Sequence, residues 1–199
     1  MATAPKSQTA IRPLKIKFFT TGGTIDKVYF DAQSEFAVGS PQVLEVVKEA
    51  NVRFEYEIES ILQKDSLDMT ESDRQFIRDR VAADPCALVV VTHGTDTMVE
   101  TARALSGLPE KTIVLTGSMQ PARFRVTDAV FNIGTAIGAV QSLPPGVYIA
   151  MNGRILDPQR AVKNRVNNCF EETTAARPSS QLARSDGEDA AKLDSQGKL

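Results

Sequence analysis

The run Ala87–Val91 is apolar at every position and rich in valine. A strand in a parallel sheet that is covered by helices on both faces has this pattern, because neither of its sides meets water. Segments at 112–115 and 146–150 are also largely apolar, and 14–19 and 53–61 are dense in residues that favour strands. The sequence therefore predicts several strands, some of them buried on both faces.

Helical signals lie between these strands. Ser40-Pro41 offers an N-cap and a proline for the first turn, and Thr70 precedes a charged segment with helically spaced apolar residues. Met98–Leu105 has one apolar face and is followed by Gly107 as a stop signal, and Thr127-Asp128 opens a helix of small residues. We read residues 24–40, before the first helix, as a long loop. The alternation of strands and helices predicts an α/β fold with a doubly wound, mostly parallel sheet and helices on both faces.

Composition restricts the class of protein. The 199 residues are 42% hydrophobic and 24% charged with a net charge of -2, which fits one soluble domain and argues against a nucleic-acid partner. The apolar runs are far shorter than the roughly 20 residues of a membrane span, and the N-terminus lacks the apolar core of a signal peptide. Two cysteines, Cys86 and Cys169, read as free thiols of a reducing compartment, so we expect a cytoplasmic protein. We divide the chain into a flexible N-terminus (1–13), one domain (14–172) and a polar, disordered tail (173–199).

Clusters of threonine, serine, glycine and aspartate follow the predicted strands, at Thr20–Thr24, Asp65–Asp68, Thr92–Asp96 and Thr116–Ser118. Ligands of open parallel sheets bind beyond the carboxyl ends of the strands, where these clusters lie. Turns and helix caps use the same residues, so one cluster alone would mean little. His93 is the single histidine, which removes a two-histidine zinc site, and we expect it to be a hydrogen-bonded structural residue. We predict no metal and no cofactor.

Two of these clusters carry recognisable strings. Thr-Gly-Gly-Thr-Ile at 21–25 and Thr-His-Gly-Thr-Asp-Thr-Met at 92–98 resemble the two signatures of the bacterial-type L-asparaginase and glutaminase family. Further similarity lies at 65–69, 115–121, 127–132, 151–154 and 160–163, in family order over about residues 14–170. The chain is thus similar to the N-terminal domain of that family, and we expect it to be a single domain without the smaller C-terminal domain that the usual family enzyme has.

The resemblance implies an amidohydrolase that converts L-asparagine to aspartate and ammonia through an acyl-enzyme intermediate. It implies that Thr24 is the nucleophile and that Thr95 is a second catalytic threonine, in a triad with Asp96 and Lys163. Asp96 would also bind the substrate α-amino group. Ser66 and the backbone around Leu67 would bind the substrate α-carboxylate. A threonine hydroxyl needs such help, because it is a weak nucleophile until a neighbouring group takes its proton.

One departure concerns the loop after the first signature, where the family has a catalytic tyrosine and this chain has Phe36. Tyr29 lies seven positions earlier and either replaces that hydroxyl, as we predict, or is an ordinary loop aromatic. The family also implies a homodimer or higher homo-oligomer. A catalytically weak amino-acid-binding or regulatory homologue is the alternative, and an amidotransferase acting on aminoacyl-tRNA is a weaker one. The sequence leaves open the choice between asparagine and glutamine, which differ by one methylene.

Overall fold

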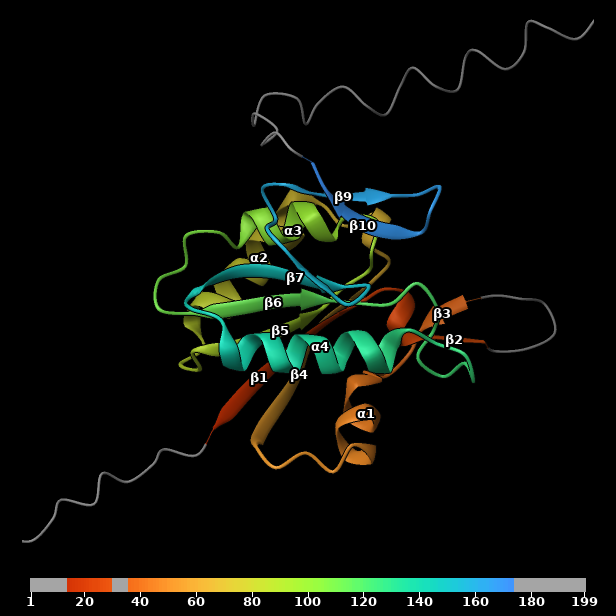
Figure 1. Ribbon diagram of the computed structural model, residues 1–199, viewed down its shortest axis with the longest axis horizontal. Coiled ribbons are helices and arrows are strands. Elements are labelled where there is room, and N and C mark those ends of the chain that lie inside the picture. Colours follow the sequence, from red (N-terminus) through yellow and green to blue (C-terminus); the bar gives the residue numbers. More distant parts are fainter. Residues whose placement is uncertain (1–13, 30–35, 174–199) are drawn as a thin grey trace, which may run out of the picture.

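The computed structural model describes residues 14–29 and 36–173, and a six-stranded sheet forms its centre (Figure 1). The strands run in the order β4-β1-β5-β6-β7-β8. All neighbours are parallel except β8, which is antiparallel to β7. The prediction of a mostly parallel α/β sheet is confirmed. The strands are β1 (Lys15–Gly22), β4 (Glu55–Lys64), β5 (Leu88–Thr92), β6 (Thr112–Thr116), β7 (Gly146–Met151) and β8 (Arg154–Leu156).

Within the described residues, four helices cover the sheet on its two faces. They are α1 (Val43–Glu49), α2 (Glu71–Ala83), α3 (Met98–Ala104) and α4 (Ala129–Ser142). Alternate residues of β5 point to opposite faces: Val90 packs with α1 and α4, whereas Val89 and Val91 pack with α2 and α3. Each face therefore has its own apolar core, and helices cover both faces as the apolar strand pattern predicts.

Local signals explain where two of these helices begin. The Thr70 hydroxyl accepts the Asp73 N–H, and the Asp73 carboxylate accepts the Thr70 N–H, so the predicted cap of α2 is confirmed as a capping box. The predicted cap at Ser40 is wrong, because Gln42 is the N-cap residue of α1. The Gln42 N–H donates to the buried side chain of Asp26, and this distant acceptor replaces a local cap.

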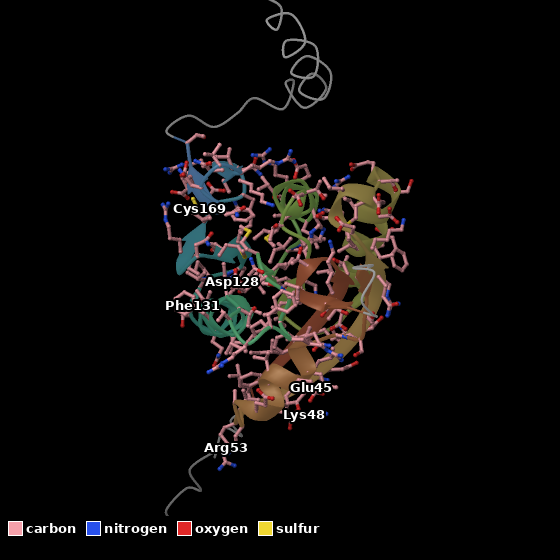
Figure 2. The ribbon with its side chains drawn as sticks, turned by 90° about the vertical axis from the view of Figure 1, so that its right-hand side faces the viewer. Glu45, Lys48, Arg53, Asp128, Phe131 and Cys169 are labelled. Atoms are coloured by element: carbon pink, nitrogen blue, oxygen red, sulfur yellow. The ribbon has the colours of Figure 1, made fainter. Side chains whose placement is uncertain are left out.

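Besides the turn from β7 to β8, the described residues form two short two-stranded hairpins where we expected none. The first lies within the predicted loop after β1 and pairs β2 (Lys27–Tyr29) with β3 (Phe36–Val38), so the expected loop is wrong there. The second pairs β9 (Ala161–Asn164) with β10 (Cys169–Glu172) next to α3. In Figure 2, Cys169 on this hairpin lies at the opposite end of the molecule from Glu45 and Lys48 on α1. Phe170 is buried in the core and so fixes the hairpin to the domain.

Both cysteines are free, as predicted. The predicted flexible segment 1–13 and residues 174–199 of the predicted tail lie outside the described residues, so the division of the chain stays a prediction. Thr173, placed in the tail, donates its N–H to the carbonyl of Arg160 at 3.0 Å. Within 14–29 and 36–173, no helix has the length and apolarity that crossing a bilayer requires.

Candidate active site

The strand order predicts a ligand crevice beyond the carboxyl ends of β1 and β5. The chain leaves β1 toward α1 on one face of the sheet and leaves β5 toward α3 on the other face. Ligands of doubly wound sheets bind at the carboxyl ends of two such strands, because their loops diverge there. The 3₁₀ turn η1 (Thr24–Asp26) follows β1. Thr92 is the last residue of β5, and the segment up to Asp96 follows it. The fold thus brings together the two segments that carry Thr24, Thr95 and Asp96.

Glycines let these segments touch through their backbones. Gly23 has a φ of 88°, and a Cβ there would lie 2.4 Å from the Cα of Gly94. A Cβ on Gly94 would in turn lie 2.5 Å from the Ser66 hydroxyl oxygen, and one on Gly117 would lie 2.3 Å from the His93 carbonyl oxygen. Real Cβ atoms do not approach so closely, so these positions require glycine. The segments that follow β1, β4, β5 and β6 are therefore in direct contact.

Ser66 begins the turn η2 (Ser66–Asp68) after β4 and is buried against the segment after β5. Its hydroxyl oxygen accepts the Asp96 N–H at 3.3 Å, and its carbonyl accepts the Thr97 hydroxyl at 2.7 Å. The neighbouring Leu67 side chain is 65% exposed, and its N–H donates to the Asp65 side chain. The structure thus places Ser66 beside Asp96, while Leu67 lies at the surface next to them.

Lys163 reaches the crevice from the β9–β10 hairpin. Its Nζ donates to the Thr95 hydroxyl oxygen at 2.7 Å and to Asp96 Oδ1 at 2.9 Å. The lysine side chain is 13% exposed, and Thr95 is buried. The predicted triad is therefore assembled, with a partly desolvated ammonium group between a hydroxyl and a carboxylate. Such a group stabilises negative charge on the hydroxyl oxygen when its proton leaves.

Arg165 and Glu100 lie next to this triad and were missed from the sequence. The Arg165 Nε is 3.7 Å from the same Asp96 oxygen that Lys163 contacts, and the guanidinium side chain is 71% exposed. One oxygen of Glu100 is buried without a hydrogen-bond partner among the described residues. Both residues line a pocket of about 260 Å³ together with Asp96, Val99, Arg103, Ala161, Val162 and Lys163. Arg165 is the first residue of the turn after β9, and no local pattern in the sequence marks it.

His93 is fully buried behind the site, and the prediction of a hydrogen-bonded structural residue is confirmed. Its Nδ1 lies 2.7 Å from the Gly94 carbonyl oxygen and its Nε2 lies 2.8 Å from the Thr101 hydroxyl. Burial lowers the pKa of the imidazole to about 4, with nearby Arg74 adding to the effect and the Gly94 carbonyl opposing it. The ring is therefore neutral at pH 7 and joins the β5 segment to α3.

Thr24 is half-buried at the start of η1, directly after Gly23, whose backbone packs against Gly94. The backbone of Tyr29 pairs directly with that of Phe36 across the β2–β3 hairpin. The two candidate positions for a loop hydroxyl are thus neighbours in the fold. Their side chains lie outside the described part of the structure, so the role of Tyr29 stays a prediction.

Known proteins with similar sequences and structures are members of the asparaginase family. The family model of the asparaginase N-terminal domain matches residues 15–192. An L-asparaginase of Thermococcus kodakarensis is 33% identical over 159 residues, which cover 75% of this chain and 48% of that protein. A glutaminase-asparaginase of Pseudomonas fluorescens biotype A is 32% identical over 173 residues, covering 77% of this chain and 46% of the relative.

The solved structure of the thermostable L-asparaginase from Thermococcus kodakarensis superposes with a TM-score of 0.70 at 31% identity. The match covers 81% of this chain and 52% of that one, so the chain spans about half the length of the relatives it matches. The part that the family model matches contains all six strands of the sheet and the four helices of the described residues. The chain belongs to the asparaginase family, in which it corresponds to the N-terminal domain.

Proposed function

We propose that this protein is an amidohydrolase that converts L-asparagine to L-aspartate and ammonia. The observation that carries the proposal is the contact of Lys163 Nζ with both the Thr95 hydroxyl and the Asp96 carboxylate, at 2.7 and 2.9 Å. A threonine hydroxyl in contact with a lysine is a device for moving a proton without histidine. The names of the relatives, L-asparaginase and glutaminase-asparaginase, support a side-chain amide as the substrate.

In the proposed reaction, the Thr24 hydroxyl oxygen attacks the side-chain amide carbon of the substrate. A carbon–oxygen bond forms, the hydroxyl proton passes by way of Thr95 to the leaving nitrogen, and the carbon–nitrogen bond breaks to release ammonia. Water then attacks the resulting ester, which regenerates Thr24 and releases aspartate. Lys163 stabilises the negative charge that develops on Thr95 during each proton transfer, and backbone N–H groups of the glycine-rich segments stabilise the oxyanion.

The same geometry supports a scheme for substrate binding. The Asp96 carboxylate lines the pocket of about 260 Å³ and is suited to the α-ammonium group of an amino acid. The Ser66 hydroxyl and the backbone near Leu67 are suited to its α-carboxylate. Holding both groups fixes the side-chain amide over Thr24, which replaces a slow bimolecular encounter by a reaction within one complex.

Ammonia release from asparagine and from glutamine tests the proposal directly. We expect the wild-type protein to release ammonia from asparagine and the Thr24→Ala variant to lose most of this activity. Thr135→Ala is the matched control, because Thr135 lies on α4 and its hydroxyl donates only to the Phe131 carbonyl. If Thr24→Ala keeps activity within a few-fold of wild type and has an unchanged melting curve, Thr24 is not the nucleophile. Binding of asparagine without ammonia release would instead favour the alternative of a catalytically weak amino-acid-binding homologue.

The proposal also covers the oligomeric state of the protein and its cellular compartment. We expect a homodimer or higher homo-oligomer in solution, which light scattering on a sizing column measures. We also expect the protein in the cytoplasm, and cell fractionation measures that.

A further inference from the structure

Asp26 is a buried carboxylate that the proposed reaction does not use. It is 2% exposed and ends the turn η1, which Thr24 begins. Its side chain accepts the Gln42 N–H at 2.8 Å, and its backbone carbonyl accepts the Gly39 N–H at 2.7 Å. Asp26 therefore ties the turn that carries Thr24 to the segment that leads into α1.

Gln42, the partner of Asp26, is itself fixed. Its side-chain amide donates to the Ser40 carbonyl at 2.7 Å and accepts from the Arg123 guanidinium at 3.0 Å. The neighbouring Ala122 donates its N–H to the Ile25 carbonyl at 3.2 Å, so the segment after β6 also holds η1. The Asp26 carboxylate thus connects η1 to a partner that other hydrogen bonds already hold in place.

The burial of Asp26 is unfavourable for its charged form. Burial raises the pKa of the carboxyl to about 7, and the Gln42 N–H opposes this rise only in part. No lysine or arginine forms an ion pair with Asp26 within residues 14–29 and 36–173. An aspartate at such a position costs stability, and residues of this kind are typical of functional sites. Asp26 lies two residues from Thr24 in a single turn, so a movement of its side chain also moves Thr24.

We propose that Asp26 is a positioning residue, whose carboxylate holds the Thr24–Asp26 turn against the start of α1 and so fixes the hydroxyl of Thr24 in the crevice. This inference rests on the proposed function, in which Thr24 is the nucleophile. Loss of the acceptor leaves the buried Gln42 N–H unsatisfied, and the turn moves to relieve it. A displacement of about 1 Å at a reacting atom lowers turnover by roughly 100-fold.

The test compares Asp26→Ala, which removes the acceptor, with Asp26→Asn, which keeps an acceptor oxygen of the same size. We expect kcat for asparagine to fall by about 10- to 100-fold in the alanine variant, with KM within about threefold of wild type. The asparagine variant should restore kcat to within a few-fold. Asp26→Glu keeps the charge but moves the acceptor by one methylene, and should also lower kcat. This last variant serves if the alanine variant does not fold.

Asp84→Ala is the matched control. Asp84 also accepts a backbone N–H, that of Cys86 at 2.8 Å, but it precedes β5 at the opposite end of the sheet. We expect a loss of stability in this variant with no change in kcat. Amide hydrogen exchange gives a second measurement: the amides of Gln42 and of residue 26 should lose protection in Asp26→Ala and keep it in Asp26→Asn.

The inference is overturned if Asp26→Ala keeps wild-type kcat, or if Asp84→Ala lowers kcat as much as Asp26→Ala does. It is also overturned if alanine leaves the exchange of both amides unchanged. Failure of the proposed function is a separate result, namely no ammonia from the wild type or full activity in Thr24→Ala. In that case the exchange measurement still decides whether Asp26 holds the turn.

Discussion

Asp26→Asn should change how the stability of the protein depends on pH. The pKa of Asp26 is raised by burial from 3.8 to about 7 in the folded state. As pH rises from 3.8 to about 7, the unfolded chain loses this proton while the folded protein keeps it, so folding becomes less favourable. The difference between 3.8 and about 7, at about 1.4 kcal/mol per pKa unit, gives an upper bound of about 4 kcal/mol lost by pH 8.

His93 acts in the opposite direction over nearly the same range. Burial lowers its pKa from 6.5 to about 4, so below pH 6.5 the unfolded chain takes up a proton that the folded protein refuses. Folding therefore becomes less favourable as pH falls, by up to about 3 kcal/mol between 6.5 and 4. The two contributions nearly cancel in the wild type between pH 4 and 6.5, so the wild-type curve alone would hide both.

Urea unfolding of the wild type and of Asp26→Asn, from pH 4.5 to 8, separates the contribution of Asp26 from that of His93. We expect the variant to gain stability relative to the wild type as pH rises, with most of the gain complete near pH 7. Asp73→Asn is the control, because Lys64 and the Thr70 N–H lower the pKa of Asp73 to about 2. It should be less stable than the wild type by a constant amount over this range. Parallel curves for the wild type and Asp26→Asn would refute the reasoning.

Three further predictions concern the site. Lys163→Met should lower kcat by roughly 10²- to 10⁴-fold with little change in melting temperature, since it deletes the ammonium and keeps the apolar stem; wild-type kcat would remove Lys163 from the mechanism. Gly94→Ala should destabilise the protein by about 1–3 kcal/mol and raise KM for asparagine, because its Cβ would lie 2.5 Å from the Ser66 hydroxyl. Tyr29→Phe should lower kcat by roughly 10²- to 10⁴-fold; an unchanged kcat would mean that Tyr29 is an ordinary loop aromatic.

The parallel sheet could be predicted because its strands carry a strong local pattern. The apolar run Ala87–Val91 indicates that neither side of the strand meets water. The four residues Thr70–Asp73 form a capping box that marks the start of α2. The hairpins β2–β3 and β9–β10 were missed because their strands are three or four residues long, too short for a period of two to stand out. Phe170 fixes the second hairpin by burial in the core, which no local pattern reveals.

For the site, the sequence identified segments but not contacts. Thr24, Thr95 and Asp96 stand in recognisable strings, whereas Lys163 lies in an unremarkable one, 67 residues after Asp96, and only the family resemblance singled it out. Asp26 and Gln42 show the limit most clearly. Their hydrogen bond joins two ordinary positions 16 residues apart, and the N-cap of α1 lies at Gln42, two residues beyond the Ser40 that local propensity favours.

The glycine contacts between Gly23, Gly94 and Gly117 and their neighbours also limit how this protein could evolve. A larger residue at any of the three would push one segment away from the next, because backbone meets backbone or Ser66 there without spare volume. Changes of substrate preference must therefore arise elsewhere around the crevice. The β9–β10 hairpin is free of this constraint, since it brings Lys163 and Arg165 to Asp96 through long, adaptable side chains. Directed evolution toward longer amides should accordingly accumulate substitutions at exposed hairpin positions such as Arg165 and Val166, and leave Lys163 and the three glycines untouched.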